Sequence, residues 1–255
     1  METTFISILI MAFSVGIASG SIGSFVILRR MALVGDAMSH VALPGIALAL
    51  AYHLDPFWGV LVFLLGAAIL IWWLENKTKL STEALVGVLF TASLAIGVLT
   101  IPDLEIIESL FGSFPNLSAV LLFLILGASV ALAFFSFFFT PKFLFATLSP
   151  ELARIEDPQR RWDLLFFLFF AFTVALGIKL VGALLMGALT IIPALIAKNM
   201  ARNMTSYLIL STFLGGLVAS GGIILARYFG FLPGPVIILF GVVLFVFSIL
   251  FRRKS

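Results

Sequence analysis

The sequence predicts an all-α, polytopic membrane protein with about nine transmembrane helices, or eight if one apolar segment is re-entrant. Of its 255 residues, 62% are hydrophobic and only 11% are charged, whereas soluble domains hold about 25% charged residues. The apolar runs are about 17–25 residues long, which is enough for a helix to cross roughly 30 Å of hydrocarbon. The alternating pattern of membrane-barrel strands, about ten residues long, does not appear.

The predicted spans follow the apolar runs in chain order. The run from Leu164 to Ala197 is too long to cross the membrane once, and it holds a single charge, Lys179, with a glycine on either side. Two tightly joined helices therefore fit this run best, and one transmembrane domain accounts for residues 1–255. The expected spans are residues 5–28, 31–52, 56–74, 83–100, 117–139, 162–179, 181–198, 205–226 and 234–251.

The positive charges predict the orientation, because Lys and Arg are enriched in cytoplasmic loops. With the N-terminus outside, 13 of the 15 Lys and Arg residues fall on the inner side, and only Lys179 and Arg227 do not. We therefore expect a multi-pass protein of the cell membrane, surrounded by lipid, with a cytoplasmic C-terminus. The net charge of +3 then reflects inner loops, and no nucleic-acid partner is expected. The inner residues are Arg29, Arg30, Lys77, Lys79, Lys142, Arg154, Arg160, Arg161, Lys198, Arg202, Arg252, Arg253 and Lys254.

Two predicted loops are longer than turns. The outer one, residues 101–118, carries three acidic residues and no basic one, and the inner one is residues 141–163. Within the inner loop, Ser149, Pro150 and Glu151 are typical of a helix start, as cap, first residue and first-turn acid. The sequence contains no nucleotide-binding glycine loop, so another chain or an ion gradient must supply the energy for any transport.

One polar pair stands out inside the second predicted span. Asp36 and His40 are four residues apart, so a helix would place both side chains on one face, about 6 Å apart along the axis. Charged groups at that depth are costly and usually mark ion pathways. The alternative is a structural pair in which Asp36 and His40 bond each other or Ser39.

A carboxylate and an imidazole are also metal ligands. Imidazole suits zinc, copper, iron and nickel, and carboxylate suits manganese and magnesium. Two ligands are too few for a closed site, but a homodimer would provide two of each. Just beyond the pair, Pro44 is expected to kink the helix and Gly45 to allow a close approach. A broken helix beside polar groups is a frequent way to build a transport site.

These residues carry a family resemblance. The stretch RRMALVGDAMSHVALPGIALA, Arg29–Ala49, closely resembles the signature of the zinc/manganese ABC-transporter permeases, in which Gly-Asp-x-x-Ser-His precedes Leu-Pro-Gly. Weaker similarities follow in the family's order at residues 81–99, 148–153, 179–197 and 231–239. One departure comes after LSPELA, where residues 154–158 read RIEDP instead of the family's Gly-Ile or Gly-Val.

The resemblance implies a helical permease related in architecture to the cobalamin and siderophore importers. It implies a homodimer, cytoplasmic ATPase subunits that bind ATP, and an extracytoplasmic metal-binding protein. Asp36 and His40 stand at the family's metal-contacting positions, and Ser149, Pro150, Glu151, Leu152 and Ala153 resemble its ATPase-coupling helix. The transported ion would be zinc or manganese, possibly iron. The chain itself would have no catalytic residue and no permanently bound cofactor.

Three other ionisable residues are weaker candidates for the transport path, and a second proline is a candidate for a helix kink. His53, Asp55 and Glu83 are weaker metal-pathway candidates, and Pro193 is expected to kink the seventh span. A secondary metal transporter or channel would use Asp36 and His40 as a relay and would need no ATPase. A cobalamin-type or metal-chelate permease would need no metal ligands at these two positions.

Overall fold

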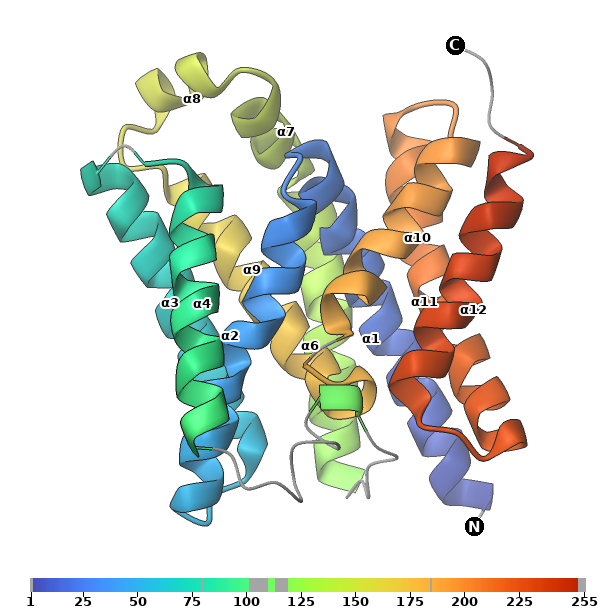
Figure 1. Ribbon diagram of the computed structural model, residues 1–255. Helices are drawn as coiled ribbons and strands as arrows, with labels where there is room; N and C mark the ends of the chain where they lie inside the picture. The colour runs from blue at the N-terminus through green and yellow to red at the C-terminus, as the bar shows by residue number, and fades with distance from the viewer. Residues whose placement is uncertain (1, 79, 101–109, 113–118, 184, 252–255) are drawn as a thin grey trace.

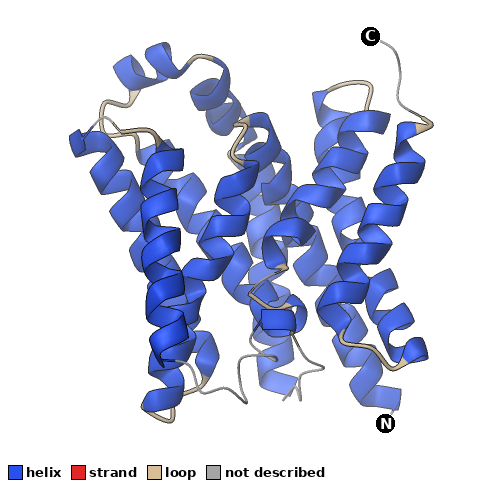
Figure 2. Ribbon diagram, viewed as in Figure 1, coloured by secondary structure: helices blue, strands red, loops and turns tan. Residues whose placement is uncertain are grey.

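A computed structural model describes residues 2–78, 80–100, 110–112, 119–183 and 185–251, and within these ranges all regular structure is α-helical (Figures 1 and 2). The prediction of an all-α membrane protein is confirmed. Among the described residues, six helices are long and apolar enough to cross a membrane, and three shorter apolar helices accompany them. The outer acidic residues Asp103, Glu105 and Glu108 lie outside the described ranges.

Each range predicted from an apolar run contains a helix, and the run from Leu164 to Ala197 is divided between two helices, as expected. The inner loop forms two additional short helices, α7 and α8. The helices are α1 (Glu2–Leu28), α2 (Ala32–Ala51), α3 (Pro56–Thr78), α4 (Thr82–Thr100), α6 (Ala119–Phe138), α7 (Thr140–Leu148), α8 (Pro150–Glu156), α9 (Arg161–Val181), α10 (Met186–Met200), α11 (Met204–Phe229) and α12 (Pro233–Ile249).

The joints between helices are sorted to the two ends of the bundle (Figure 1). The α1–α2, α3–α4 and α10–α11 joints and the short helices α7 and α8 lie at one end, at the top of the view. The start of α1 and the α2–α3 and α11–α12 joints lie at the opposite end. The Lys- and Arg-bearing joints that the sequence assigns to the cytoplasm are therefore at one end, called the inner end below.

Helix α1 runs through the middle of the bundle and packs most closely on α11. A Cβ atom on Gly20 would overlap the carbonyl oxygen of Ser211, so only glycine allows this approach. The Ser211 hydroxyl donates to the Gly20 carbonyl over 2.6 Å, and the Tyr207 hydroxyl donates to the Ser24 carbonyl over 3.0 Å. Between helices surrounded by lipid the hydrophobic effect does not favour association. Close packing of small residues and interhelical hydrogen bonds stabilise the contact instead.

Three glycines hold the turn between α9 and α10. Gly112 and Gly182 have φ values of 74° and 89°, which favour glycine. A Cβ atom on either of them, or on Gly234 at the start of α12, would overlap backbone oxygens of the neighbouring segments. Helix α10 begins just after this turn and has 15 residues. Its length, about 22 Å, is less than the roughly 30 Å of the hydrocarbon layer, so α10 begins within the bundle.

Candidate functional site

The predicted polar pair lies on the first half of α2. His40 is buried, with 6% of its surface exposed, whereas Asp36, one turn earlier, is exposed. The His40 ring meets the Phe90 ring of α4 edge-on, with 5.1 Å between the ring centroids. The sequence predicted a shared face for the pair, and the structure adds that α4 covers the histidine but not the aspartate.

His40 has unused bonding capacity. Its Nδ1 atom is buried and has no hydrogen-bond partner within the described ranges. The Ser39 hydroxyl donates to the Gly35 carbonyl of its own helix over 3.0 Å, so it is already engaged. A buried polar atom without a partner costs about 1–3 kcal/mol, and such atoms in native proteins usually have a reason. The buried imidazole nitrogen of His40 is therefore available to a ligand or a hydrogen-bond partner from outside the described residues.

One copy of the chain offers too few donors for a closed metal site. Among the described residues, no group of three or more His, Cys, Asp or Glu side chains could hold a metal ion. Asp36 and His40 therefore provide one carboxylate and one imidazole, and further donors must come from outside the described residues. An exposed aspartate next to a buried histidine suits a site that is completed by a second surface.

Helix α10 begins directly against this pair. A Cβ atom on Gly187, the second residue of α10, would lie 2.6 Å from the Asp36 Cα and 3.0 Å from the Gly35 carbonyl carbon. Glycine therefore lets the first turn of α10 touch the backbone that carries Asp36. Gly187 could not be identified from the sequence, because a glycine among apolar residues gives no sign of its partner.

The two predicted proline sites lie inside continuous helices. Helix α2 continues through Pro44 from Ala32 to Ala51 and does not break there. Helix α10 likewise continues through the buried Pro193. Gly45 faces Gly59 of α3, and a Cβ atom on either glycine would overlap the carbonyl oxygen of the other. Helix α3 thus packs closely against α2 at the residue that follows Pro44.

The weaker candidates do not complete a metal site with Asp36 and His40 in the described part of the chain. His53 is exposed and lies in the α2–α3 turn with a positive φ of 54°. An Asp55 carboxylate oxygen accepts a hydrogen bond from the Phe57 backbone N–H over 2.9 Å, at the start of α3. Glu83 is exposed in the first turn of α4.

The predicted helix start in the inner loop is confirmed. Pro150 is the first residue of α8 and Glu151 lies in its first turn, whereas Ser149 stands at the N-cap position without a capping hydrogen bond from its side chain. Leu148, Leu152 and Ile155 are 76%, 57% and 77% exposed. Leu148 ends α7, whereas Leu152 and Ile155 are three residues apart on one face of α8. Helices α7 and α8 lie at the inner end of the protein (Figure 1), so these exposed apolar side chains face outward there.

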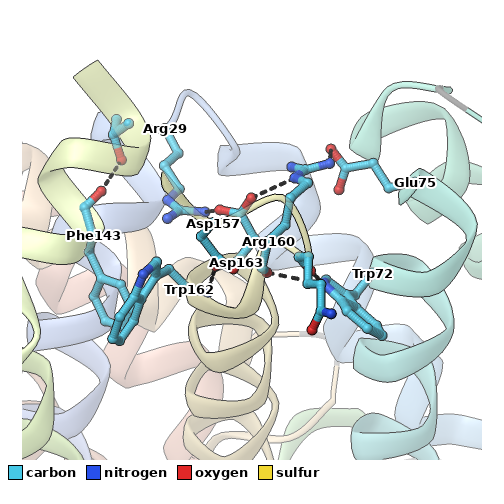
Figure 3. A network of polar contacts seen from close by, with 10 residues as sticks. Arg29, Trp72, Glu75, Phe143, Asp157, Arg160, Trp162 and Asp163 are labelled. Carbon is cyan, nitrogen blue, oxygen red and sulfur yellow. Dashed lines mark hydrogen bonds and ion pairs between the residues drawn. The ribbon is translucent and has the colours of Figure 1, made fainter. Parts of the chain in front are cut away.

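A cluster of four charged residues lies at the base of this loop (Figure 3). We call Arg29, Glu75, Arg160 and Asp163 the inner charge cluster. Burial lowers the pKa of Arg29 below its usual value, although the Asp163 carboxylate opposes this effect. Burial also disfavours the charged form of Arg160, but Asp163 and Glu75 outweigh it and raise the pKa of Arg160. Each guanidinium pairs with at least one carboxylate, so the cluster is a set of largely buried ion pairs.

A cavity of about 490 Å³ opens beside the cluster. Arg29, Arg160 and Asp163 contribute to its wall, together with residues of the α1–α2 joint and of α7 and α8. This cavity could not be predicted from the sequence, because its walls come from segments that are distant along the chain.

The protein is an apolar helical bundle with a carboxylate–imidazole pair on a transmembrane helix. A separate pair of helices lies at its inner end. These features define a polytopic membrane permease. The chain belongs to the ABC 3 transport family, whose model matches residues 1–252.

Individual relatives agree with this assignment. The chain is 33% identical, over 91% of each sequence, to the high-affinity zinc uptake system membrane protein ZnuB of Haemophilus influenzae. It is 29% identical to the manganese import system permease protein ScaB of Streptococcus parasanguinis, over 97% of this chain and 90% of that protein. The solved structure of PsaBC from Streptococcus pneumoniae in complex with Fab superposes with a TM-score of 0.82 at 28% identity, over 97% of this chain and 95% of that one.

Proposed function

We propose that this protein is the membrane permease subunit of an ATP-driven importer that moves a divalent transition-metal ion, zinc or manganese, into the cytoplasm. The observation that carries the proposal is the buried His40, whose Nδ1 has no partner in the described residues, one turn from the exposed Asp36. The names of the zinc and manganese relatives support the same class of cargo.

The donor set also suggests the assembly. Each copy offers one carboxylate and one imidazole, so two copies around a twofold axis would offer four donors. Such a set suits zinc or manganese without closing permanently around either ion. In this proposal two cytoplasmic ATPase subunits bind ATP and dock on α7 and α8, and an extracytoplasmic protein delivers the metal. The N-terminus is then outside, and the chain itself contributes no catalytic residue.

The proposal is tested by metal uptake into proteoliposomes that hold this chain with its ATPase and binding protein. Zinc and manganese are assayed separately, with and without ATP. We expect uptake of at least one of them that depends on ATP and on the binding protein. Uptake by this chain alone, driven by an ion gradient and indifferent to ATP, would instead identify a secondary transporter.

The apolar face of α8 provides a prediction about the ATPase. Replacing Leu152 by Asp places a charge on an exposed apolar face, so docking of a partner there should weaken. We expect ATP-dependent uptake to fall about tenfold, consistent with about 1.4 kcal/mol or more at an interface residue. Co-purification of the ATPase with the L152D chain measures the effect directly. The matched control is Leu80→Asp, an exposed leucine in the α3–α4 joint, which should leave co-purification unchanged.

Gly187 provides a second prediction. Valine at this position would push the first turn of α10 away from the Asp36 backbone, because its Cβ has no room there. Since displacement of a site by about 1 Å can cost about 100-fold in function, we expect G187V to reduce uptake by about 10–100-fold. Gly66→Val on α3, where a Cβ meets no atom within 4 Å, is the control. Equal uptake by the two variants would show that α10 does not position the pair.

A further inference from the structure

The inner charge cluster joins segments that lie far apart in the sequence. Arg29 lies between the end of α1 and the start of α2, and Asp163 lies in the first turn of α9. Glu75 lies near the inner end of α3, and Arg160 lies in the turn that follows α8. The cluster therefore connects the end of the inner loop, residues 141–163, with the joint from which α2 begins.

The contacts within the cluster are short and largely shielded from water (Figure 3). The Arg29 Nη1 donates to Asp163 Oδ1 over 2.8 Å, and the Arg160 Nε donates to Asp163 Oδ2 over 2.8 Å. The Arg160 Nη1 also pairs with Glu75 Oε1 over 2.8 Å. The four side chains are only 9–17% exposed. Removal of one partner from such a buried set leaves an uncompensated charge.

The turn between α8 and α9 is held firmly on this cluster. The Trp72 indole N–H on α3 lies 3.1 Å from the Gln159 carbonyl oxygen and 3.0 Å from that of Arg160. Arg160 itself has a positive φ of 52°, which a non-glycine residue adopts only when its surroundings hold it. The Arg29 guanidinium also lies over the Phe166 ring of α9, 4.2 Å from its centroid. If the inner loop moves, Asp163 and Arg29 must therefore move with it, or these contacts must break.

We infer that Asp163 and Arg29 are positioning residues that transmit movement of the coupling helices α7 and α8 to the metal-site helix α2. Arg29 precedes Asp36 by only seven residues, and the joint between them is short. A shift of the loop that turns Asp163 would pull on Arg29 and so reorient the start of α2. The inference rests on the proposed function, because it assigns a route between the ATPase-docking helices and the metal site.

The test separates transmission from assembly. Asp163→Asn keeps the shape of the side chain and removes the charge that holds both guanidiniums. In proteoliposomes with the ATPase and the binding protein, we expect this variant to assemble and hydrolyse ATP. Metal uptake per ATP hydrolysed should fall about tenfold, the size of a typical coupling between distant sites.

A second readout follows α2 directly. The chain contains no cysteine, so Ala37→Cys, next to Asp36, gives this chain a single thiol for a water-soluble maleimide. In the otherwise unchanged chain we expect ATP to alter the labelling rate at position 37. In the Asp163→Asn background ATP should no longer alter it, although hydrolysis continues. A merely stabilising role for Asp163 would lower the amount of complex without abolishing this response.

The chain offers a matched control in the same loop. Lys142 on α7 pairs with Glu156 on α8 over 2.9 Å, but these side chains are 42% and 53% exposed. Exposed ion pairs contribute little, and this one stays within the loop. Lys142→Gln should therefore leave uptake per ATP and the labelling response unchanged. A fall equal to that of Asp163→Asn would mean that any charge lost from the loop has the same effect, and would overturn the inference.

The remaining outcomes are also decisive. Wild-type uptake per ATP in Asp163→Asn would overturn the inference and leave the proposed function intact. If Asp163→Asn does not assemble, Arg29→Lys decides, because it keeps the charge and loses only the guanidinium geometry. The Arg29→Lys variant should show the same fall in metal uptake per ATP hydrolysed. Uptake per ATP equal to that of the wild type would overturn the inference. Failure of the unmodified complex to import metal would contradict the proposed function, and this inference with it.

Discussion

Replacement of Asp36 or His40 by alanine is expected to abolish ATP-dependent metal uptake while the complex still assembles. The two side chains are the carboxylate and the imidazole of one turn of α2, and a single chain has no third donor beside them in its described part. Loss of even an outer partner of a metal site costs about 10–100-fold in affinity. Loss of a ligand should therefore reduce uptake by about 100-fold or more, as measured with zinc and manganese separately.

The chain supplies its own control for this prediction, because His53 is its only other histidine. His53 is exposed and has a positive φ, so Asn, which tolerates that backbone conformation, is the suitable replacement. His53→Asn should retain most of the uptake. If Asp36→Ala and His40→Ala also transport at the wild-type rate, the pair is structural, and a cobalamin-type route that needs no ligands there becomes the better explanation.

Replacement of Gly20 by alanine is expected to destabilise the whole bundle. The added methyl group would overlap the Ser211 carbonyl oxygen, which belongs to the backbone of α11 and cannot turn aside. Overpacking costs about 1–3 kcal/mol, and separation of the helices also weakens the hydrogen bond from Ser211 to Gly20, worth about 1 kcal/mol. We expect a loss of about 3 kcal/mol, or about 10 °C in the melting temperature of the purified protein.

Gly127 on α6 is the matched control for this second prediction. It lies in a helix interior like Gly20, but a Cβ atom there meets nothing within 4 Å. Alanine should therefore leave the melting temperature unchanged or raise it slightly, since alanine favours helix by about 1 kcal/mol over glycine. Equal destabilisation by the two substitutions would show that contact between α1 and α11 is not what limits stability.

The features that the sequence predicted are those set by local chemistry. The length of an apolar run determines a helix, and the fixed thickness of a bilayer predicts that the run from Leu164 to Ala197 divides. The boundary predicted near Lys179 falls inside α9, which continues to Val181. The Asp36–His40 pair and the start of α8 at Pro150 are likewise contained in a few consecutive residues. The kink expected at Pro44 stays a prediction: α2 continues through the proline, and Gly45 packs on Gly59.

The features that the sequence did not predict depend on contacts between distant segments. Asp163 and Arg29 are separated by 134 residues, and neither has a sequence neighbour that indicates its partner. Gly187 is one of 21 glycines, and only its packing on Asp36 distinguishes it. Helix periodicity predicts that Asp36 and His40 lie on one side of α2. It does not predict that Phe90 of α4 packs on the histidine while the aspartate stays exposed.

The central position of α1 has a consequence for how the protein is made. The hydrogen bond from Ser211 to Gly20 spans 191 residues, so the ribosome must synthesise most of the chain before α1 meets α11. Until then α1 lacks its main partner, although α6, α9 and α10, which also pack on it, are made earlier. Ser14, Ser21 and Ser24 each donate to a carbonyl three residues earlier in α1 itself, so the nascent helix needs no partner to satisfy these hydroxyl groups. Helix α1 can therefore insert first and be joined by its main partner near the end of translation.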